Sequence, residues 1–403
     1  MDDSVFDEDQ GKVDFVEVPN NPGGEQNFSA KAQQDKFLAG PAKIPEDKPA
    51  PQNQQKEQWP MGERKSIEVN GRTWEYLEYG NPNGTPILNV HGWLGSSAEG
   101  NARLARALSG EVQESQGLKN LEKPHVENSQ NSQPHGGAPK GAEKVRKLTE
   151  SLKGKYNVIV PELPGFGKTP ELDTPTVDKM AEELADFYKA LGKKPAVAFG
   201  SSAGAILVTK MAVQHPELVD TLVLQGLMTK PSDMEKVPYW AARVVTFKPI
   251  AKVLETFPNF STEKLFPMMV SGGKDFKNAD EATQRLILDS AKEGHIPTML
   301  DTLRDIGKNI EDEVAQVQAP TVIIDGANGD LVPIAKSKSN AGKFHPEAGE
   351  SLGEKIRQRK VVYFRVGDAA GEHTHNVINT APEEVAVLIN HAAEYFKPKP
   401  QAK

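Results

Sequence analysis

The chain has 403 residues and no cysteine, and its 48 Lys and Arg side chains stand against 56 Asp and Glu, a net charge of −8. The missing cysteines exclude disulfides, thiolate metal ligands and a cysteine nucleophile. No apolar run reaches the length of about 18 residues that a membrane-spanning helix needs, and the acidic start lacks the basic and apolar regions of a secretory signal. We therefore expect a cytoplasmic protein without an integral membrane segment.

Most of the negative charge lies at the start of the chain. Residues 1–20 hold seven acids and one base, so the remaining 383 residues carry a net charge of only −2. Proteins that bind nucleic acid neutralise its phosphates with clustered bases, and no basic stripe is visible here. We therefore do not expect this protein to bind nucleic acid.

Residues 1–60 are predicted to form a disordered N-terminal arm. The arm begins with the acidic cluster, and residues 41–60 hold five prolines and four glutamines among few aliphatic side chains. Such a composition buries too little apolar surface to offset the entropy of ordering the chain. The sequence identifies no protein partner for this arm.

Regular structure is predicted from about Arg64 onward. Asn70-Gly71 between alternating apolar residues is typical of a β-hairpin. Further along lie continuous apolar runs, which are typical of strands buried on both faces; they cover residues 86–90, 156–163, 196–199, 220–226, 320–325 and 360–366. Helical patterns such as 179–192 and 382–396 alternate with them, and this alternation predicts an α/β fold with a mostly parallel sheet. At the start of the last helix, Thr380 and Glu383 have the spacing of a capping box.

Two segments interrupt the alternation. Residues 109–142 are rich in polar side chains and glycine, and we expect a flexible surface insertion there. Residues 228–312 contain helical patterns without a strand candidate, which predicts an all-helical lid over one edge of the sheet. The core then consists of residues 61–227, with the insertion, and residues 313–403.

The strongest chemical signal is Gly200-Ser201-Ser202-Ala203-Gly204, which follows an apolar strand and opens a helix. A serine on a tight strand-to-helix turn needs very small residues two positions to either side, because the strained backbone brings those positions close together. Gly200 and Gly204 meet this need for a nucleophile elbow. They make Ser202, and not Ser201, the expected nucleophile.

A second signal is His91-Gly92-Trp93 at the end of the strand at 86–90. Backbone N–H groups in such a loop can point into the space above the sheet and bind the oxyanion of an acyl-transfer intermediate. On this reasoning the N–H groups of Trp93 and Ala203 form the oxyanion hole.

Five motifs together resemble the α/β-hydrolase fold family in content and order. They are HGWLGSS from residue 91, PELPGFGKT from 161, GSSAG from 200, DGANGDLVP from 325 and HTHNVINTAPEEV from 373. The resemblance covers about residues 64–397 and is closest to the lid-bearing branch of esterases, lipases, C–C bond hydrolases and aminopeptidases. It implies an eight-stranded, mostly parallel sheet with helices on both faces, an all-helical lid, and a catalytic order of Ser, acid, His.

The resemblance places the catalytic acid after the strand at 320–325. The family pattern is similar to G-x-x-D with a proline a few positions on, whereas this chain has one more residue between Gly326 and Asp330. Asp330 is the predicted acid. Asp325, at the end of the strand, remains the alternative.

The resemblance also implies the catalytic base. Family members place it seven residues before the proline that opens the last helix, which here is Pro382 and gives His375, with His373 as the alternative. In the family, a histidine at the position of His91 braces the oxyanion loop. Glu162 stands where the family commonly has an aspartate that supports a loop.

These residues predict a serine hydrolase that cleaves a small or medium carboxylic ester of an acyl or aryl type, without a metal or organic cofactor. Apolar lid residues are expected to line a pocket or to form the core of the lid: Trp240, Phe247, Phe257, Phe260, Phe266, Met268 and Met269. An aminopeptidase or C–C bond hydrolase with the same triad is an alternative, with Glu235, Glu255 and Glu263 available to bind a substrate ammonium. A non-catalytic binding or scaffold protein is the third interpretation.

Overall fold

The computed structural model describes residues 62–93, 98–122, 138–233, 244, 247–256, 285, 289, 295–306, 308, 310–326, 361–366 and 376–396. All of them belong to one compact unit of the chain. The predicted N-terminal arm, residues 1–60, lies outside the described residues, and the prediction of disorder stays a prediction.

The described chain opens with the predicted hairpin. Strands β1 (Glu63–Val69) and β2 (Arg72–Gly80) pair antiparallel, with Val69 opposite Arg72. Asn70 and Gly71 form the turn with φ of 51° and 75°. Two consecutive positive φ values define a type I′ turn, which Asn-Gly adopts at low cost. The hairpin prediction is confirmed.

The hairpin lies at one edge of a sheet with the order β1-β2-β4-β3-β5-β6-β7-β8. Only the pairs β1–β2 and β2–β4 are antiparallel; the remaining pairs are parallel. The strands after the hairpin are β3 (Thr85–Val90), β4 (Tyr156–Pro161), β5 (Val197–Ser201), β6 (Leu222–Gln225), β7 (Thr321–Gly326) and β8 (Val361–Val366). The predicted α/β fold with a mostly parallel sheet is confirmed.

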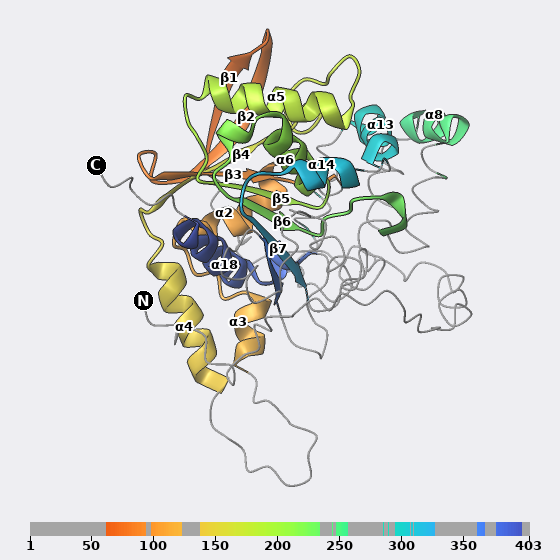
Figure 1. Cartoon of the computed structure of the whole chain (residues 1–403). Helices are drawn as coiled ribbons and strands as arrows, with labels where there is room; N and C mark the ends of the chain where they lie inside the picture. Colours follow the sequence, from red (N-terminus) through yellow and green to blue (C-terminus); the bar gives the residue numbers. More distant parts are fainter. Residues whose placement is uncertain are drawn as a thin grey trace, which may run out of the picture. The chain divides into compact units, whose positions relative to one another are not determined.

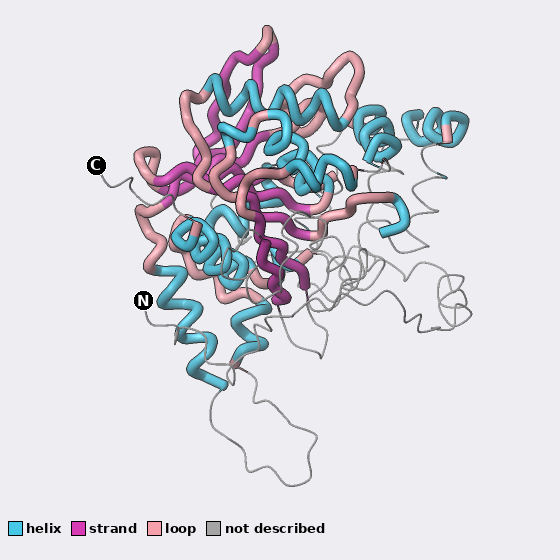
Figure 2. Tube along the Cα trace, viewed as in Figure 1, coloured by secondary structure: helices cyan, strands magenta, loops and turns pink. Residues whose placement is uncertain are grey.

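Helices cover both faces of this sheet (Figures 1 and 2). In β4, Val158 and Val160 belong to one apolar core, whereas Ile159 belongs to the other. The continuous apolar runs are therefore strands buried on both faces, as predicted. One core contains α5 (Val177–Ala190), α6 (Ala203–Gln214) and α14 (Glu311–Gln316); the other contains α2 (Ala102–Leu108), α17 (Val377–Thr380) and α18 (Pro382–Tyr395).

The start of α18 differs from its sequence prediction. The N-cap residue is Ala381, which offers no side-chain cap, and Pro382 opens the helix. Thr380 instead ends the short helix α17, and its hydroxyl faces the carbonyl oxygen of Asn376 at 3.4 Å. Glu383 accepts a hydrogen bond from the backbone N–H of Gln113 at 2.8 Å. The capping-box prediction is wrong because Glu383 serves a neighbouring segment and not its own helix end.

The predicted flexible insertion is partly ordered into the fold. Helix α3 (Gln116–Leu121) begins at Ser115, whose hydroxyl caps it, and the Leu118 side chain is fully buried. Helix α4 (Ala138–Glu150) packs against α18 and α3. Residues 123–137 of the insertion lie outside the described residues. Helix α3 packs against both α4 and α18, and its buried Leu118 joins this packing.

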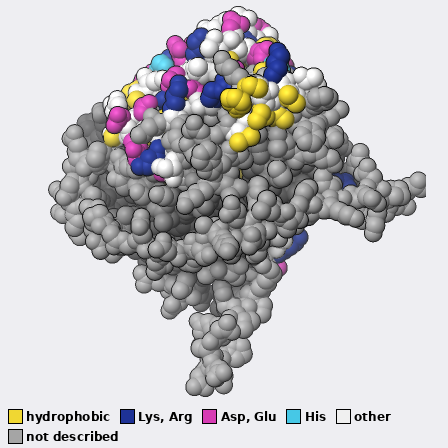
Figure 3. Space-filling view, turned by 90° about the vertical axis from the view of Figure 1, so that its right-hand side faces the viewer, with side chains coloured by type: hydrophobic (Ala, Val, Ile, Leu, Met, Phe, Trp, Pro, Cys, Tyr) yellow, Lys and Arg dark blue, Asp and Glu magenta, His cyan; other side chains and the backbone are white. Residues whose placement is uncertain are grey.

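In the segment predicted as a lid, the described part consists mainly of α8 (Lys248–Thr256) and α13 (Ile296–Ile306), which pack together. The Leu254 side chain of α8 is buried, but an apolar stripe is exposed (Figure 3). The stripe consists of Val244, Phe247, Ile250 and Val253, with Phe247 61 % exposed. Phe247 is therefore not part of a buried lid core. The other apolar residues named for the lid lie outside the described residues.

None of the helices in the described part of the chain is long and apolar enough to cross a membrane.

A partly buried acid at the start of α18, Glu384, predicts a pH dependence of stability. The Oε1 atom of Glu384 is buried without a hydrogen-bond partner, against Gly117 of α3. Burial, and to a lesser degree the charge of Glu383, raises the pKa of Glu384 to about 8 from 4.5. Between these values the unfolded chain releases a proton that the folded chain keeps, so stability falls as pH rises through this window.

We expect Glu384→Gln to raise the melting temperature relative to the parent at pH 9 by more than at pH 4.5, because the amide cannot ionise. Thermal unfolding followed by circular dichroism at pH 4.5, 7 and 9 measures the difference. Glu143→Gln removes a 55 % exposed carboxylate on α4 as a control. A difference in melting temperature that does not change with pH contradicts the prediction.

Candidate active site

Ser202 lies between the end of β5 and the first residue of α6, at φ 54° and ψ −117°. Positive φ is rare for a residue with a side chain and costs free energy, and such strain concentrates at functional sites. The turn is held by hydrogen bonds on both sides. The N–H of Ser202 donates to the carbonyl of Gln225 at 2.7 Å, and its carbonyl accepts from the N–H of Ala205 at 2.9 Å.

The two glycines of the motif are required by close backbone contacts. A Cβ atom on Gly200 would lie 2.3 Å from the carbonyl oxygen of Gly204. One on Gly204 would lie 2.5 Å from the carbonyl oxygens of Val90 and His91 at the end of β3. Both distances are far below any real Cβ contact. The structure therefore brings the predicted elbow residues together with the predicted oxyanion loop.

The two serines of the motif have different roles. The Ser201 side chain is buried, and its hydroxyl donates to Oε1 of Gln225 at 2.5 Å. Ser202 is partly exposed. Of the two serines, Ser202 is thus the more exposed.

The backbone at Gly92 lies beside Ser202. A Cβ atom on Gly92 would lie 3.2 Å from the Cβ of Ser202. Ala203 is the first residue of α6, and the N–H groups of the first helical turn have no partner within the helix. The positive end of the helix macrodipole also favours an anion at this point. The predicted donors, Trp93 and Ala203, thus belong to segments that meet at Ser202.

His91 is buried and holds this loop with both ring nitrogens. Its Nε2 accepts the N–H of Leu163 at 3.3 Å, so Nδ1 carries the proton and donates to the carbonyl of Gly92 at 2.8 Å. Burial lowers the pKa of His91 to about 4. The ring, which packs edge-on against Phe166, is therefore neutral near pH 7.

Glu162 supports the loop that follows β4. Its buried carboxylate accepts from Nη1 of Arg64 at 2.7 Å and from the N–H of Lys168 at 2.6 Å. Burial raises its pKa, and these two donors oppose the shift. Arg64 also bonds Glu99, just beyond the oxyanion loop. The Glu162 carboxylate thus connects Arg64 of the hairpin with the N–H of Lys168 in the loop. This contact agrees with the loop-supporting role that the resemblance implied.

The predicted acid and base, Asp330 and His375, lie outside the described residues, as does His373. The alternative acid, Asp325, is described: it lies within β7 with a buried side chain, and its Oδ1 accepts the N–H of Gly226 at 3.1 Å. Its carboxylate is thus engaged with the end of β6.

Two sets of residues were not identified from the sequence. Gln225, fully buried at the end of β6, binds the elbow through both its backbone carbonyl and its side chain. Met299 and Thr302 of α13 accept hydrogen bonds from the indole of Trp93. Gln225 could have been noticed in the sequence, because it is a polar residue at the end of an otherwise apolar strand. The sequence contains no sign that Thr302, on a distant helix, contacts Trp93.

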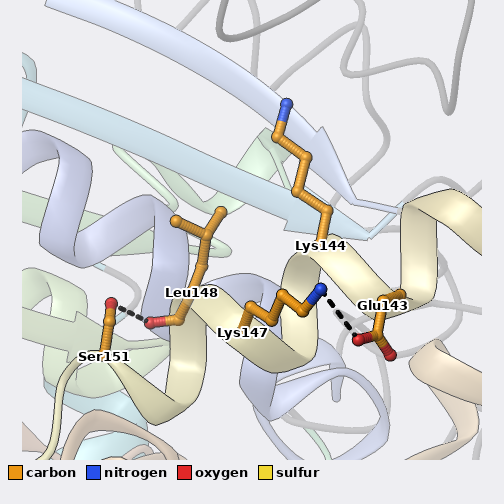
Figure 4. A pocket seen from close by; sticks show the side chains of 5 residues that line it. All are labelled: Glu143, Lys144, Lys147, Leu148 and Ser151. Carbon is orange, nitrogen blue, oxygen red and sulfur yellow. Dashed lines mark hydrogen bonds and ion pairs between the residues drawn. The ribbon is translucent and has the colours of Figure 1, made fainter.

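A pocket on α4 lies away from this site. Figure 4 shows its lining, Glu143, Lys144, Lys147, Leu148 and Ser151, none of which comes from the loops around Ser202. Lys147 pairs with Glu143 at 3.2 Å. Within the described part of the chain, no three His, Asp or Glu side chains gather as metal ligands do.

Comparison with known proteins identifies the family. Residues 134–348, just over half of the chain, match the alpha/beta hydrolase fold family. The chain belongs to this family, and the enzyme class predicted from the sequence, an α/β-hydrolase, is confirmed.

Curated relatives include esterases. A pimeloyl-(acyl-carrier protein) methyl ester esterase of Chromobacterium violaceum is 23 % identical over 205 residues, which cover 51 % of this chain and 75 % of the relative. The corresponding esterase of Aliivibrio fischeri is 23 % identical over 188 residues, covering 46 % and 70 %.

Solved structures share the fold. An N-acyl homoserine lactonase complexed with N-hexanoyl homoserine lactone superimposes with a TM-score of 0.54 at 15 % identity, over 83 % of this chain and 98 % of that chain. A thermophilic esterase from Thermogutta terrifontis gives a TM-score of 0.51 at 17 % identity. The superposition covers 84 % of this chain and 100 % of the esterase chain. At such identities the likeness is one of fold.

The elbow geometry predicts that Gly200→Ala is strongly destabilising. The added methyl group meets backbone atoms of α6 that cannot move without breaking the turn. We expect a loss of about 2 kcal/mol or more in the free energy of unfolding, as for other overpacked sites. Urea denaturation followed by circular dichroism measures it.

Gly141→Ala on α4 is the matched control. A Cβ at Gly141 meets no atom within 4 Å. Because alanine is the better helix former, this variant should be neutral or more stable by up to about 1 kcal/mol. Equal effects of the two substitutions would show that the close approach at Gly200 is not a constraint.

Proposed function

We propose that this α/β-hydrolase cleaves a carboxylic ester through a Ser202–His375–Asp330 triad and an acyl-enzyme. The observation that carries the proposal is the backbone of Ser202: a non-glycine residue at positive φ, on a strand-to-helix turn, with a partly exposed side chain. Backbone strain of this kind clusters at functional sites, which favours an enzyme over a scaffold protein.

In the proposed first step His375 takes the hydroxyl proton of Ser202 as its oxygen attacks the ester carbonyl. The backbone N–H groups of Trp93 and Ala203 bind the resulting oxyanion, and collapse of the intermediate releases the alcohol with a proton from the imidazolium. Water, deprotonated by the same imidazole, then attacks the acyl-enzyme; the bond to the Ser202 oxygen breaks, the carboxylic acid leaves, and the imidazolium returns its proton to Ser202. Asp330 orients the imidazole and stabilises its charged form.

The ester class rests on the relatives as well as the site. Both curated relatives described above are named as methyl ester esterases. A small-molecule ester is the proposed substrate, and residues 228–312 are proposed to form a helical lid over one edge of the sheet. Aminopeptidase and C–C bond hydrolysis use the same triad, so ester, amide and diketone panels belong in the first assay.

The nucleophile is tested with a fluorophosphonate probe. We expect labelling at Ser202 that disappears in Ser202→Ala, whereas Ser201→Ala still labels because its hydroxyl only bonds Gln225. His375→Ala should abolish fast labelling, since an unassisted serine is a weak nucleophile. His373→Ala is its matched control.

Mass spectrometry locates the label. A purified protein that resists the probe and hydrolyses no activated ester would favour the scaffold interpretation. Loss of labelling in His373→Ala, with His375→Ala active, would move the base by two residues.

Asp330→Asn tests the acid. Without a carboxylate to orient His375, turnover should fall by about a thousandfold or more. Asp325→Asn should have a much smaller effect on turnover, because an asparagine Oδ1 still accepts the N–H of Gly226. Steady-state kinetics on an activated ester compares the two, and the reverse ranking would place the catalytic acid on β7.

A further inference from the structure

We propose that Thr302 and Met299 of α13 position the oxyanion hole by holding the indole of Trp93. This inference rests on the proposed function, which assigns the backbone N–H of Trp93 to the oxyanion. It adds a role for the Trp93 side chain and identifies α13 as part of the support of the catalytic site.

The indole of Trp93 is anchored inside the protein. Only 6 % of Trp93 is exposed, and its Nε1–H donates to the carbonyl of Met299 and to Oγ1 of Thr302, the latter at 3.0 Å. The Thr302 hydroxyl donates to the carbonyl of Thr298 at 2.6 Å. Its own proton is thus used within the helix, and its lone pairs face the indole. Buried hydrogen bonds of this kind fix a side chain because water does not compete for the donor.

Helix α13 is itself held in place without Trp93. The N–H of His295, just before the helix, donates to the carbonyl of Gly165 at 2.8 Å. Asp305, near its end, accepts the N–H of Val177 at 2.7 Å. Met299 and Leu300 are buried in the core shared with α5 and α6. The helix therefore acts as a fixed support for the indole.

The peptide group between Gly92 and Trp93 is held by a different residue, His91. His91 donates to the carbonyl of Gly92 at 2.8 Å. In a trans peptide the C=O and the following N–H point in opposite directions. Holding the Gly92 carbonyl therefore aims the N–H of Trp93 away from His91.

Trp93 thus has two anchors: His91 holds the peptide group that precedes it, and α13 holds its indole side chain. An oxyanion donor must lie about 2.7–3.1 Å from the developing charge. Loosening one anchor lets the N–H move, which weakens transition-state binding while leaving substrate contacts unchanged. The expected signature is a lower kcat at constant KM.

Thr302→Val is the test, because it replaces the hydroxyl with a methyl group of similar size. With an activated ester as substrate, we expect kcat to fall by about tenfold, less than the loss of a whole donor, and KM to change by no more than about twofold. Thr302→Ser restores the acceptor and should recover most of kcat. Trp93→Phe, which lacks the indole N–H, should behave like Thr302→Val.

Thr149→Val on α4 is the matched control. Thr149 is equally buried, and its hydroxyl likewise bonds a carbonyl four residues earlier, that of Val145 at 2.9 Å. It contacts none of the loops described around Ser202. This variant should lose stability to a similar extent and keep the parent kcat.

Affinity for a boronic acid that forms a tetrahedral serine adduct gives a second readout. It should weaken in Thr302→Val by about the same factor as kcat, and should not change in Thr149→Val. A parallel NMR measurement should show the indole N–H signal of Trp93, identified by its loss in Trp93→Phe, shifted in Thr302→Val.

The inference is overturned if Thr302→Val lowers the melting temperature but leaves kcat and boronic acid affinity at the parent values. It is also overturned if Thr302→Ser fails to recover kcat. A parent protein that the fluorophosphonate probe does not label overturns the proposed function, and this inference with it. If the probe labels Ser202 in the parent protein but Thr302→Val turns over the ester at the parent rate, this inference is overturned and the proposed function is not.

Discussion

The close approach of three backbone segments at Ser202 is the constraint on which the rest of the site depends. Positive φ at Ser202 costs of order 1–3 kcal/mol and persists only where the surroundings enforce it. Gly204 packs onto the end of β3, Gly200 packs onto the first turn of α6, and Gln225 of β6 binds the turn from below. The position of Ser202 therefore depends on the same contacts that hold the loop at His91 and Gly92 against it.

In the loops around Ser202 the backbone N–H and C=O groups no longer pair with a neighbouring strand, so they need other hydrogen-bond partners. His91 binds Leu163 and thereby joins the loop after β3 to the loop after β4. Glu162 binds Lys168 within the second loop and Arg64 of the hairpin. The antiparallel hairpin thus has a function beyond closing one edge of the sheet, since its arginine supports a loop of the site.

The sequence was most informative where one short segment determines the structure by itself. The Asn70-Gly71 turn, the apolar strands and the Gly-x-Ser-x-Gly spacing can each be recognised within one short segment, and each was predicted. The contact of Gly204 with the end of β3 could not be recognised in this way. The roles of Gln225 and Thr302 depend on which residues meet in space, and a capping-box spacing at Thr380 gave no sign that Gln113 would bind Glu383 instead. Asp330 and His375 remain predictions from family resemblance, because no described contact involves them.

The state of the described histidines supports the search for a base elsewhere. His91 is adjacent to the elbow in space, but one ring nitrogen accepts from Leu163 and the other donates to Gly92, so neither is left for Ser202. With its pKa lowered to about 4 by burial, His91 is also a weak base near pH 7. His295 pairs with Glu171. An imidazole bonded through both ring nitrogens can fix a loop, but it cannot accept a proton without breaking one of those bonds. His91 is therefore a poor candidate for the base, and His375 stays the residue that the family resemblance predicts.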